Sequence, residues 1–237
     1  MTQVRLPKVI YPCPIIEAII EFRFDPIIEA DAVFGLVYNQ FKEKYPKLIK
    51  LPILQLPEVV RQQPDLRYKP SYKMMNDEFI FQIGSHVISL TSFRKYVGWE
   101  KLFQEIKECI AKLNELQFIG KYSRVGLRYI NFFDINIFDK IKFELNQKNL
   151  KGHSTSLRTE MISDGFLSIL QVANSAEISV DGGQKKKGSL IDIDVIVSDR
   201  QESFENMTAL IEQAHTKEKE IFFELIGEYI TEFKVVN

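Results

Sequence analysis

Strict two-residue alternation near the N-terminus is the feature that most constrains how this chain folds. In the segment AIIEFRF, residues 18–24, apolar side chains alternate with Glu21 and Arg23. Successive side chains of a strand point to opposite faces of its sheet. The pattern therefore predicts a strand with one buried apolar face and one charged face.

A second strand of the same kind is predicted at residues 122–133, around the sequence RVGLRYINFF. Arg124 and Arg128 are four residues apart, so they share one face of the sheet. Gly126 lies between them on that face and would leave room for a ligand or a close backbone approach. Asn131 lies on the opposite face.

Apolar spacing and breaker residues predict the remaining elements. Helices are expected at 29–44, 99–117, 137–146 and 202–233, further strands at 66–75, 78–83, 87–90, 157–163, 167–173, 176–180 and 190–197, and an extended edge strand or covering arm at 48–60. This order predicts the α+β class, with a mainly antiparallel sheet and helices on one face.

The two halves of the chain echo one another. EFRFD at 21–25 and INFFD at 130–134 each end a predicted strand and precede a helix. We expect one compact domain over 1–237, and two interpretations of the echo stay open. One is an ancient duplication with pseudo-repeats 15–120 and 121–237; the other is no duplication, because residue identity between the halves is weak. TATA-binding-protein-like and helix-grip folds share this order of elements, an analogy that carries no function.

Composition narrows the cellular setting. The chain has 31 Lys and Arg against 32 Asp and Glu, a net charge of −1, which weakens the case for broad DNA binding. Two cysteines, Cys13 and Cys109, form no disulfide framework. No signal peptide and no apolar run of membrane-spanning length is present in the sequence. We therefore expect a cytoplasmic protein that does not enter a membrane.

Motifs for catalysis, metals and cofactors are missing from the sequence. It contains no GxSxG, SxxK, GxxxxGK[ST] or strand-following GxGxxG pattern. The three histidines, His86, His153 and His215, have no second histidine or cysteine at metal-ligand spacing. We expect no metal, no cofactor and no catalytic residue that the sequence can name.

A charged cluster is the main candidate site. If the two alternating strands lie side by side, Glu21 pairs with Arg128, and Arg23, Arg124 and Asn131 lie nearby. Three interpretations stay open: a structural salt bridge, a groove that binds an anionic ligand, and a carboxylate–arginine catalytic centre.

Two further basic features could contact phosphate. The stretch DGGQKKKG, residues 181–188, predicts a flexible hairpin loop whose Lys185, Lys186 and Lys187 could dock a phosphate or nucleic acid. The alternative is a solvated loop tip. Basic residues alternate with aromatic residues in RYK at 67–69 and FRKY at 93–96. Such side chains can stack on the bases of single-stranded nucleic acid, although the alternation of a strand explains the pattern equally well.

Several segments together resemble a known family. They are PCPIIEAIIEFRFDP at 12–26, SHVISLTSFRKYVGWEKLFQEI at 85–106, RVGLRYINFFDI at 124–135 and AHTKEKEIFFELI at 214–226. This order resembles a sporadically distributed family of uncharacterised prokaryotic proteins with an EFRFDP-like N-terminal segment and an RxGLRYxN strand. The resemblance implies no activity; the patchy distribution implies mobile genes, such as defence or toxin–antitoxin loci.

The function expected from these features is non-enzymatic. The leading hypothesis is a cytoplasmic binding or regulatory protein that engages a protein, a nucleic acid or a second copy of itself. The alternative is a ligand-binding or hydrolytic domain that acts on a nucleotide or another phosphate-bearing ligand.

Overall fold

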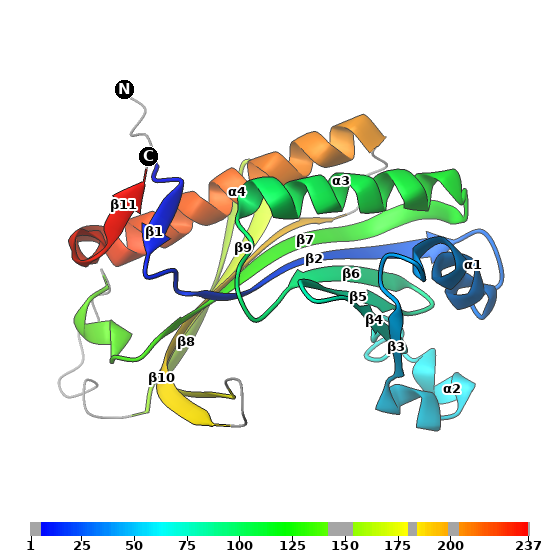
Figure 1. The fold of residues 1–237 in the computed structure, drawn as a ribbon, viewed down its shortest axis with the longest axis horizontal. Helices are drawn as coiled ribbons and strands as arrows, with labels where there is room; N and C mark the ends of the chain where they lie inside the picture. The colour runs from blue at the N-terminus through cyan, green and yellow to red at the C-terminus, as the bar shows by residue number, and fades with distance from the viewer. Residues whose placement is uncertain (1–5, 142–153, 180–183, 199–203, 237) are drawn as a thin grey trace. The chain divides into compact units, whose positions relative to one another are not determined.

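The computed structural model describes residues 6–141, 154–179, 184–198 and 204–236 (Figure 1). The helices are α1 (Ala32–Phe41), α2 (Glu58–Arg61), α3 (Trp99–Glu115) and α4 (Phe204–Ile226), with 3₁₀ turns η1 (Pro52–Gln55), η2 (Ile137–Asp139) and η4 (Gly227–Glu232). The strands are β1 (Val9–Tyr11), β2 (Ile15–Pro26), β3 (Lys47–Lys50), β4 (Tyr72–Met75), β5 (Phe79–Ile83), β6 (Val87–Ser92), β7 (Ile119–Phe133), β8 (Ser156–Ser163), β9 (Phe166–Ser179), β10 (Lys185–Ser198) and β11 (Lys234–Val236).

The predicted α+β class is confirmed. Nine strands follow the hydrogen-bonded order β3-β4-β5-β6-β2-β7-β10-β9-β8, while β1 and β11 form a separate two-stranded sheet. The pairings β2–β6, β3–β4, β4–β5, β5–β6 and β8–β9 are all antiparallel. The predicted duplication is not confirmed.

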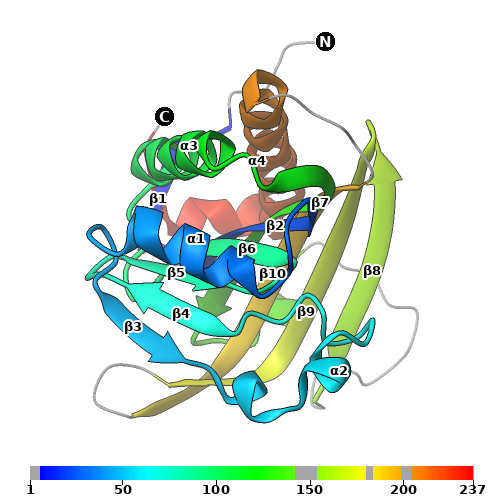
Figure 2. The same cartoon turned by 90° about the vertical axis from the view of Figure 1, so that its right-hand side faces the viewer.

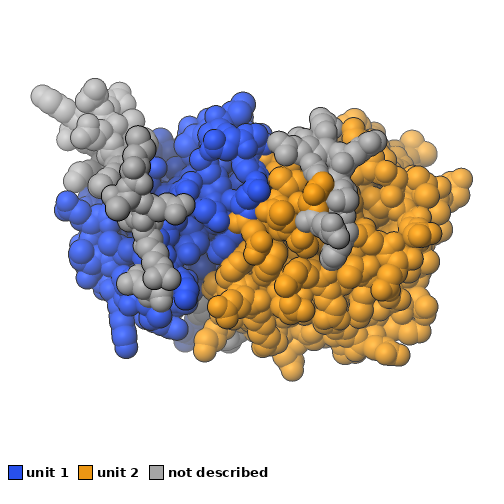
Figure 3. Space-filling view, turned by 90° about the horizontal axis from the view of Figure 1, so that it is seen from above, with its two compact units in different colours: residues 1–16, 128–195, 213–237 blue, residues 17–127, 196–212 orange. Residues whose placement is uncertain are grey.

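The chain divides into two compact units (Figure 3). Unit 1 comprises residues 1–16, 128–195 and 213–237, and unit 2 comprises residues 17–127 and 196–212. Strands β2 and β7 each begin in one unit and continue in the other.

Unit 2 has a sheet with two unlike faces, as the alternation in β2 predicts. Phe22 of β2 lies opposite Ile88 of β6, and both are buried. Glu21, one residue earlier, lies opposite Ser89 and points to the other face. The residues of β2 therefore separate into a buried apolar row and a partly exposed charged row.

Helices α1 and α3 cover the apolar face of unit 2 (Figure 1 and Figure 2). Phe41 at the end of α1 and Tyr45 just beyond it stack on Phe81 of β5, with ring centroids 4.5 and 5.3 Å apart. Leu102 and Ile106 of α3 are fully buried. Burial of this apolar area holds both helices on the same face of the sheet.

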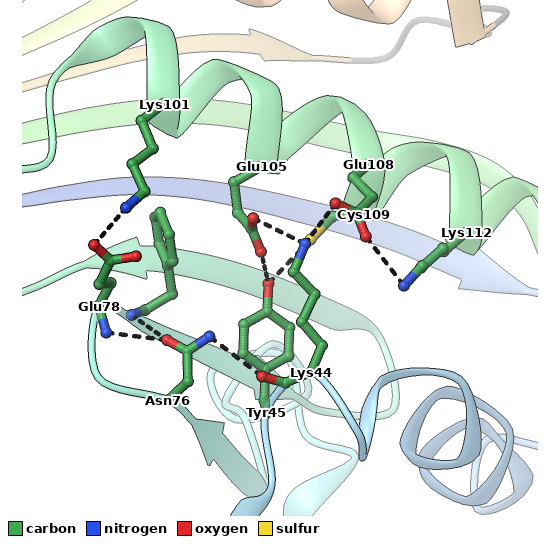
Figure 4. Close-up of polar contacts among 10 residues, drawn as sticks. Lys44, Tyr45, Asn76, Glu78, Lys101, Glu105, Glu108, Cys109 and Lys112 are labelled. Atoms are coloured by element: carbon green, nitrogen blue, oxygen red, sulfur yellow. Dashed lines mark hydrogen bonds and ion pairs between the residues drawn. The ribbon is translucent and has the colours of Figure 1, made fainter.

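A polar network joins α3 to the segment after α1 (Figure 4). The Tyr45 hydroxyl donates to Glu105 and lies 3.5 Å from the Cys109 Sγ. Lys44 pairs with Glu105 at 2.9 Å and with Glu108 at 2.6 Å. Burial raises the pKa of Cys109 to about 12, so the thiol stays protonated at neutral pH and is a poor nucleophile. This network connects α3 with the segment that follows α1.

The described helices include none that is both long and apolar enough to cross a lipid bilayer.

In unit 1, helix α4 carries two buried ionisable residues, His215 and Glu218, about one helical turn apart. The Tyr129 hydroxyl of β7 lies 3.3 Å from His215 Nδ1. Glu218 is 5% exposed. Burial raises the pKa of Glu218 to about 8, against a smaller lowering by Lys219, and it lowers the pKa of His215 to about 3. Both side chains are therefore neutral in the folded protein between those two values.

These two pKa shifts predict opposite effects of pH on stability. Between pH 4.5 and 8 the folded protein keeps a proton on Glu218 that the unfolded chain releases, so the free energy of unfolding falls as pH rises through that range. Between pH 6.5 and 3 the unfolded chain protonates His215 while the folded protein does not, so the free energy of unfolding falls as pH drops. Stability should be greatest between the two ordinary values, pH 4.5 and 6.5.

We predict that Glu218→Gln removes the loss of stability above pH 6.5. The free energy of unfolding of wild-type protein should fall by about 2 kcal/mol between pH 6.5 and 8. That of the glutamine variant should change little, because glutamine has no proton to release. Urea unfolding at several pH values measures this. Glu220→Gln, an exposed change on the same helix, should keep the wild-type slope. Parallel pH profiles for wild type and Glu218→Gln would contradict the assignment.

Several predicted elements differ from the structure. The extended arm at 48–60 is wrong beyond residue 50, because Pro52 and Pro57 begin the short helical turns η1 and α2. The final helix gives way to the 3₁₀ turn η4 at Gly227, whose φ is +48°. Of the helix predicted at 137–146, only the 3₁₀ turn η2 is seen, and residues 142–153 lie outside the described part.

Candidate functional site

The charged face of unit 2 brings together three of the predicted site residues. Arg124 of β7 donates to the Glu21 carboxylate of β2, and Arg23 Nε donates to the same Oε1 at 2.8 Å. Glu21 therefore accepts from two guanidinium groups. The side chains of all three are partly exposed, at 16 to 33%. Asp25 lies in the same row of β2, so this face presents acidic as well as basic groups to an approaching ligand.

The charged face continues through Tyr68, in the loop between α2 and β4. The Arg23 guanidinium lies 4.8 Å from the centroid of the Tyr68 ring, and the Arg67 guanidinium lies 5.0 Å from it. Both distances are typical of cation–π contacts. Tyr68 thereby connects Arg23 with Arg67 and keeps their cationic groups on the same side of unit 2.

Asp25 and His86 both contact Arg67. Its Nη2 donates to Asp25 at 3.0 Å and lies 3.3 Å from His86 Nδ1. Burial, followed by the charge of Arg67, lowers the pKa of His86, against smaller raising effects of the Phe24 carbonyl and Asp25. His86 is therefore neutral at neutral pH, and its Nδ1 accepts from Arg67 in one tautomer or donates to the Phe24 carbonyl oxygen, also 3.3 Å away, in the other. These contacts fix the orientation of the Arg67 guanidinium.

Next to Arg67 is a small pocket, which we call the arginine pocket. Its polar lining consists of Arg61, Gln62, Arg67, Lys69, Ser71 and Ser85, and Ile53 and Leu66 complete it. No carboxylate lines it. The Nε atoms of Arg61 and Arg67 are buried, and neither has a hydrogen-bond partner among the described residues. A buried donor without an acceptor is unfavourable, so the pocket is suited to an anion.

Local backbone structure builds the arginine pocket. Helix α2 presents Arg61 in its last turn. The following loop is closed by hydrogen bonds from Arg67 N to Gln63 O and from Lys69 N to Leu66 O, both 2.8 Å. The sequence pattern singled out 67–69 as aromatic and basic, but it did not single out Arg61, which lies between the predicted arm at 48–60 and the predicted strand at 66–75.

Gly84 allows this loop to lie against the turn between β5 and β6. A Cβ at Gly84 would lie 2.8 Å from the Lys69 carbonyl oxygen and 2.8 Å from Val87 Cγ1. Neither distance is tolerated by a real side chain, so only glycine permits this approach. The contact brings Ser85 beside the loop that carries Arg67.

Two predicted site residues, Arg128 and Asn131, belong to unit 1. Arg128 forms a bidentate pair with Asp192 of β10, at 2.8 Å from Nε and 2.5 Å from Nη2. The predicted pairing of Glu21 with Arg128 would join the two units and stays a prediction. Within unit 2, the arginine of β7 that contacts Glu21 is Arg124. Asn131 is buried, and its Nδ2 donates to the Ile191 carbonyl at 3.3 Å.

The predicted lysine loop is mostly strand. Lys185, Lys186, Lys187 and Gly188 lie in β10, while residues 181–183 are outside the described residues. The three lysines are exposed, and Lys185 pairs with Glu177 at 2.6 Å. Gly188 is required there, because a Cβ would lie 2.1 Å from the Phe133 carbonyl oxygen. The lysines remain candidates for phosphate contact.

A larger hollow, of about 430 Å³, lies beside residues 93–97. Its lining mixes acids and bases: Asp77, Glu78, Arg94, Lys95 and Lys101. Lys101 pairs with Glu78, and Arg94 lies 5.1 Å from the centroid of the adjacent Phe93 ring. The basic and aromatic groups at 93–94 thus contact each other. Nothing here favours a ligand of one charge.

The described residues contain no group of histidines, cysteines and carboxylates placed to hold a metal ion. Comparison with models of known protein families, with curated proteins and with solved structures finds no match to this chain. The arginine pocket and the charged face beside it are therefore assessed from their own geometry.

We predict that Gly84→Ala destabilises the protein, by about 1 to 3 kcal/mol, because the new methyl group displaces the loop that carries Arg67. Gly35→Ala is the matched control. It lies within α1, and a Cβ added there would have nothing within 4 Å, so alanine should be neutral or slightly stabilising. Thermal unfolding compares the two. Equal melting temperatures for both variants would show that the loop does not depend on Gly84.

Proposed function

We propose that this chain is a non-enzymatic, cytoplasmic binding protein that holds a phosphate-bearing partner on the charged face of unit 2. The arginine pocket is the observation that carries the proposal. Two arginine Nε donors are buried there without an acceptor among the described residues, and no carboxylate lines the pocket. Arginine is the side chain best suited to phosphate, because its planar group offers several donors at fixed angles.

The chemistry of the site supports binding over catalysis. Arginine does not exchange protons near neutral pH, and the Glu21 carboxylate is occupied by two guanidinium groups. His86 is the titratable group beside Arg67 with an ordinary pKa near neutrality, and its Nδ1 is engaged by Arg67 and the Phe24 carbonyl. These side chains are arranged to hold an anion in place.

A nucleic acid or nucleotide is the partner class that we propose. Both supply phosphate groups, and the cationic groups that continue from the pocket to Arg124 could contact further phosphates. A regulatory or defence role, suggested by the family resemblance, is compatible with such a partner. A protein partner or a homodimer remains a prediction from the sequence.

Fluorescence anisotropy with a labelled single-stranded oligonucleotide at low salt tests the proposal. Wild-type protein should bind, and Arg61→Ala combined with Arg67→Ala should weaken binding about tenfold or more, because two charge-assisted hydrogen bonds are lost. Lys185→Ala combined with Lys187→Ala removes the same charge at the other candidate site and should weaken binding less than about threefold.

Two results would contradict the proposal. One is the absence of binding by folded wild-type protein at low salt. The other is a loss of affinity in the variant that lacks Lys185 and Lys187 but not in the variant that lacks Arg61 and Arg67. That result would show that the phosphate binds at β10.

A further inference from the structure

We propose that the arginine pocket binds a terminal phosphate monoester in preference to an internal phosphodiester. This inference rests on the proposed function and goes beyond it, because it names the chemical group that the site distinguishes. General attraction to a nucleic-acid backbone requires only surface cations. The arginine pocket has a feature that such attraction does not need, which is a pair of buried donors.

The size of the pocket restricts what can enter. Its free volume is about 10 Å³, which is room for a single water-sized atom. A terminal phosphate has three unesterified oxygens and can insert one of them while the others stay at the rim. An internal diester has two such oxygens, and chain continues on both sides of it. The small volume therefore favours the end of a chain or a free nucleotide.

Charge favours the same group. A phosphate monoester carries a charge of about −1.5 to −2 at pH 7, more than the single charge of a diester. Arg61, Arg67 and Lys69 place three cationic groups around the pocket, of which Arg67 is also paired with Asp25, and the lining itself holds no acid. The better match in charge is with the monoester.

The donors are positioned in advance of binding. Nη2 of Arg67 is in contact with Asp25 and His86, and its Nε is buried without an acceptor among the described residues, so this guanidinium has a donor left for a ligand. Ser71, which is 7% exposed, and Ser85 add hydroxyl groups to the lining. A fixed set of donors lowers the entropy lost on binding and selects ligands by geometry.

The test compares two labelled oligonucleotides of one sequence, with a 5′-phosphate or a 5′-hydroxyl end. Wild-type protein should bind the 5′-phosphate form about tenfold more tightly, because one more charge-assisted contact forms. Arg61→Lys keeps the positive charge but lacks the Nε donor of arginine, so this variant should bind both forms with similar affinity. Lys185→Arg, a conservative change far along the sequence in β10, should keep the preference.

The outcomes separate this inference from the proposed function. Equal affinity of wild-type protein for the two oligonucleotides would overturn the inference and leave the proposed function standing. If neither oligonucleotide binds, the nucleic-acid form of the proposed function fails. Calorimetry with AMP and adenosine then tests whether the arginine pocket binds a terminal phosphate. Binding of AMP but not adenosine supports the terminal-phosphate site and identifies a free nucleotide as the ligand. Binding of neither overturns the inference.

Discussion

The two-faced strand β2 is the constraint on which the rest of unit 2 depends. Its apolar side chains, such as Phe22, must lie under α1 and α3, because burial of apolar area is the main force available to hold those helices. The period of two then directs Glu21 and Arg23 to the other face. A slip of one residue would bury both charges, at a cost of several kcal/mol. The core therefore fixes the position of the charged face.

The arginine pocket adds an irregular segment to this regular sheet. Residues 52–71 form two short helical turns and a closed loop, and Gly84 allows that loop to approach the β5–β6 turn. The result is a rigid group of cations beside the charged row of β2. Arg67 belongs to both features, since it contacts Tyr68 and Asp25 on one side and lines the pocket on the other.

Sequence patterns predicted the parts of this structure that follow from periodicity. The α+β class, the strand around Phe22 and the shared face of Arg124 and Glu21 follow from alternation, which depends on local geometry. The contact between Glu21 and Arg124 was not predicted as a pair, because alternation gives the face of a residue and leaves the strand register to distant contacts. Arg61 was not singled out, because its place beside Arg67 depends on helix α2 and the loop that follows it, which no local periodicity indicates.

The most direct test of the central claim is NMR of the arginine Nε–H groups during titration with AMP. We predict that the Nε–H signals of Arg61 and Arg67, assigned by substitution of each arginine, shift with a common affinity, while that of Arg128, paired with Asp192 in unit 1, stays in place. Shifts of both signals would place the phosphate in the arginine pocket. Binding of AMP that leaves both unchanged would contradict the account.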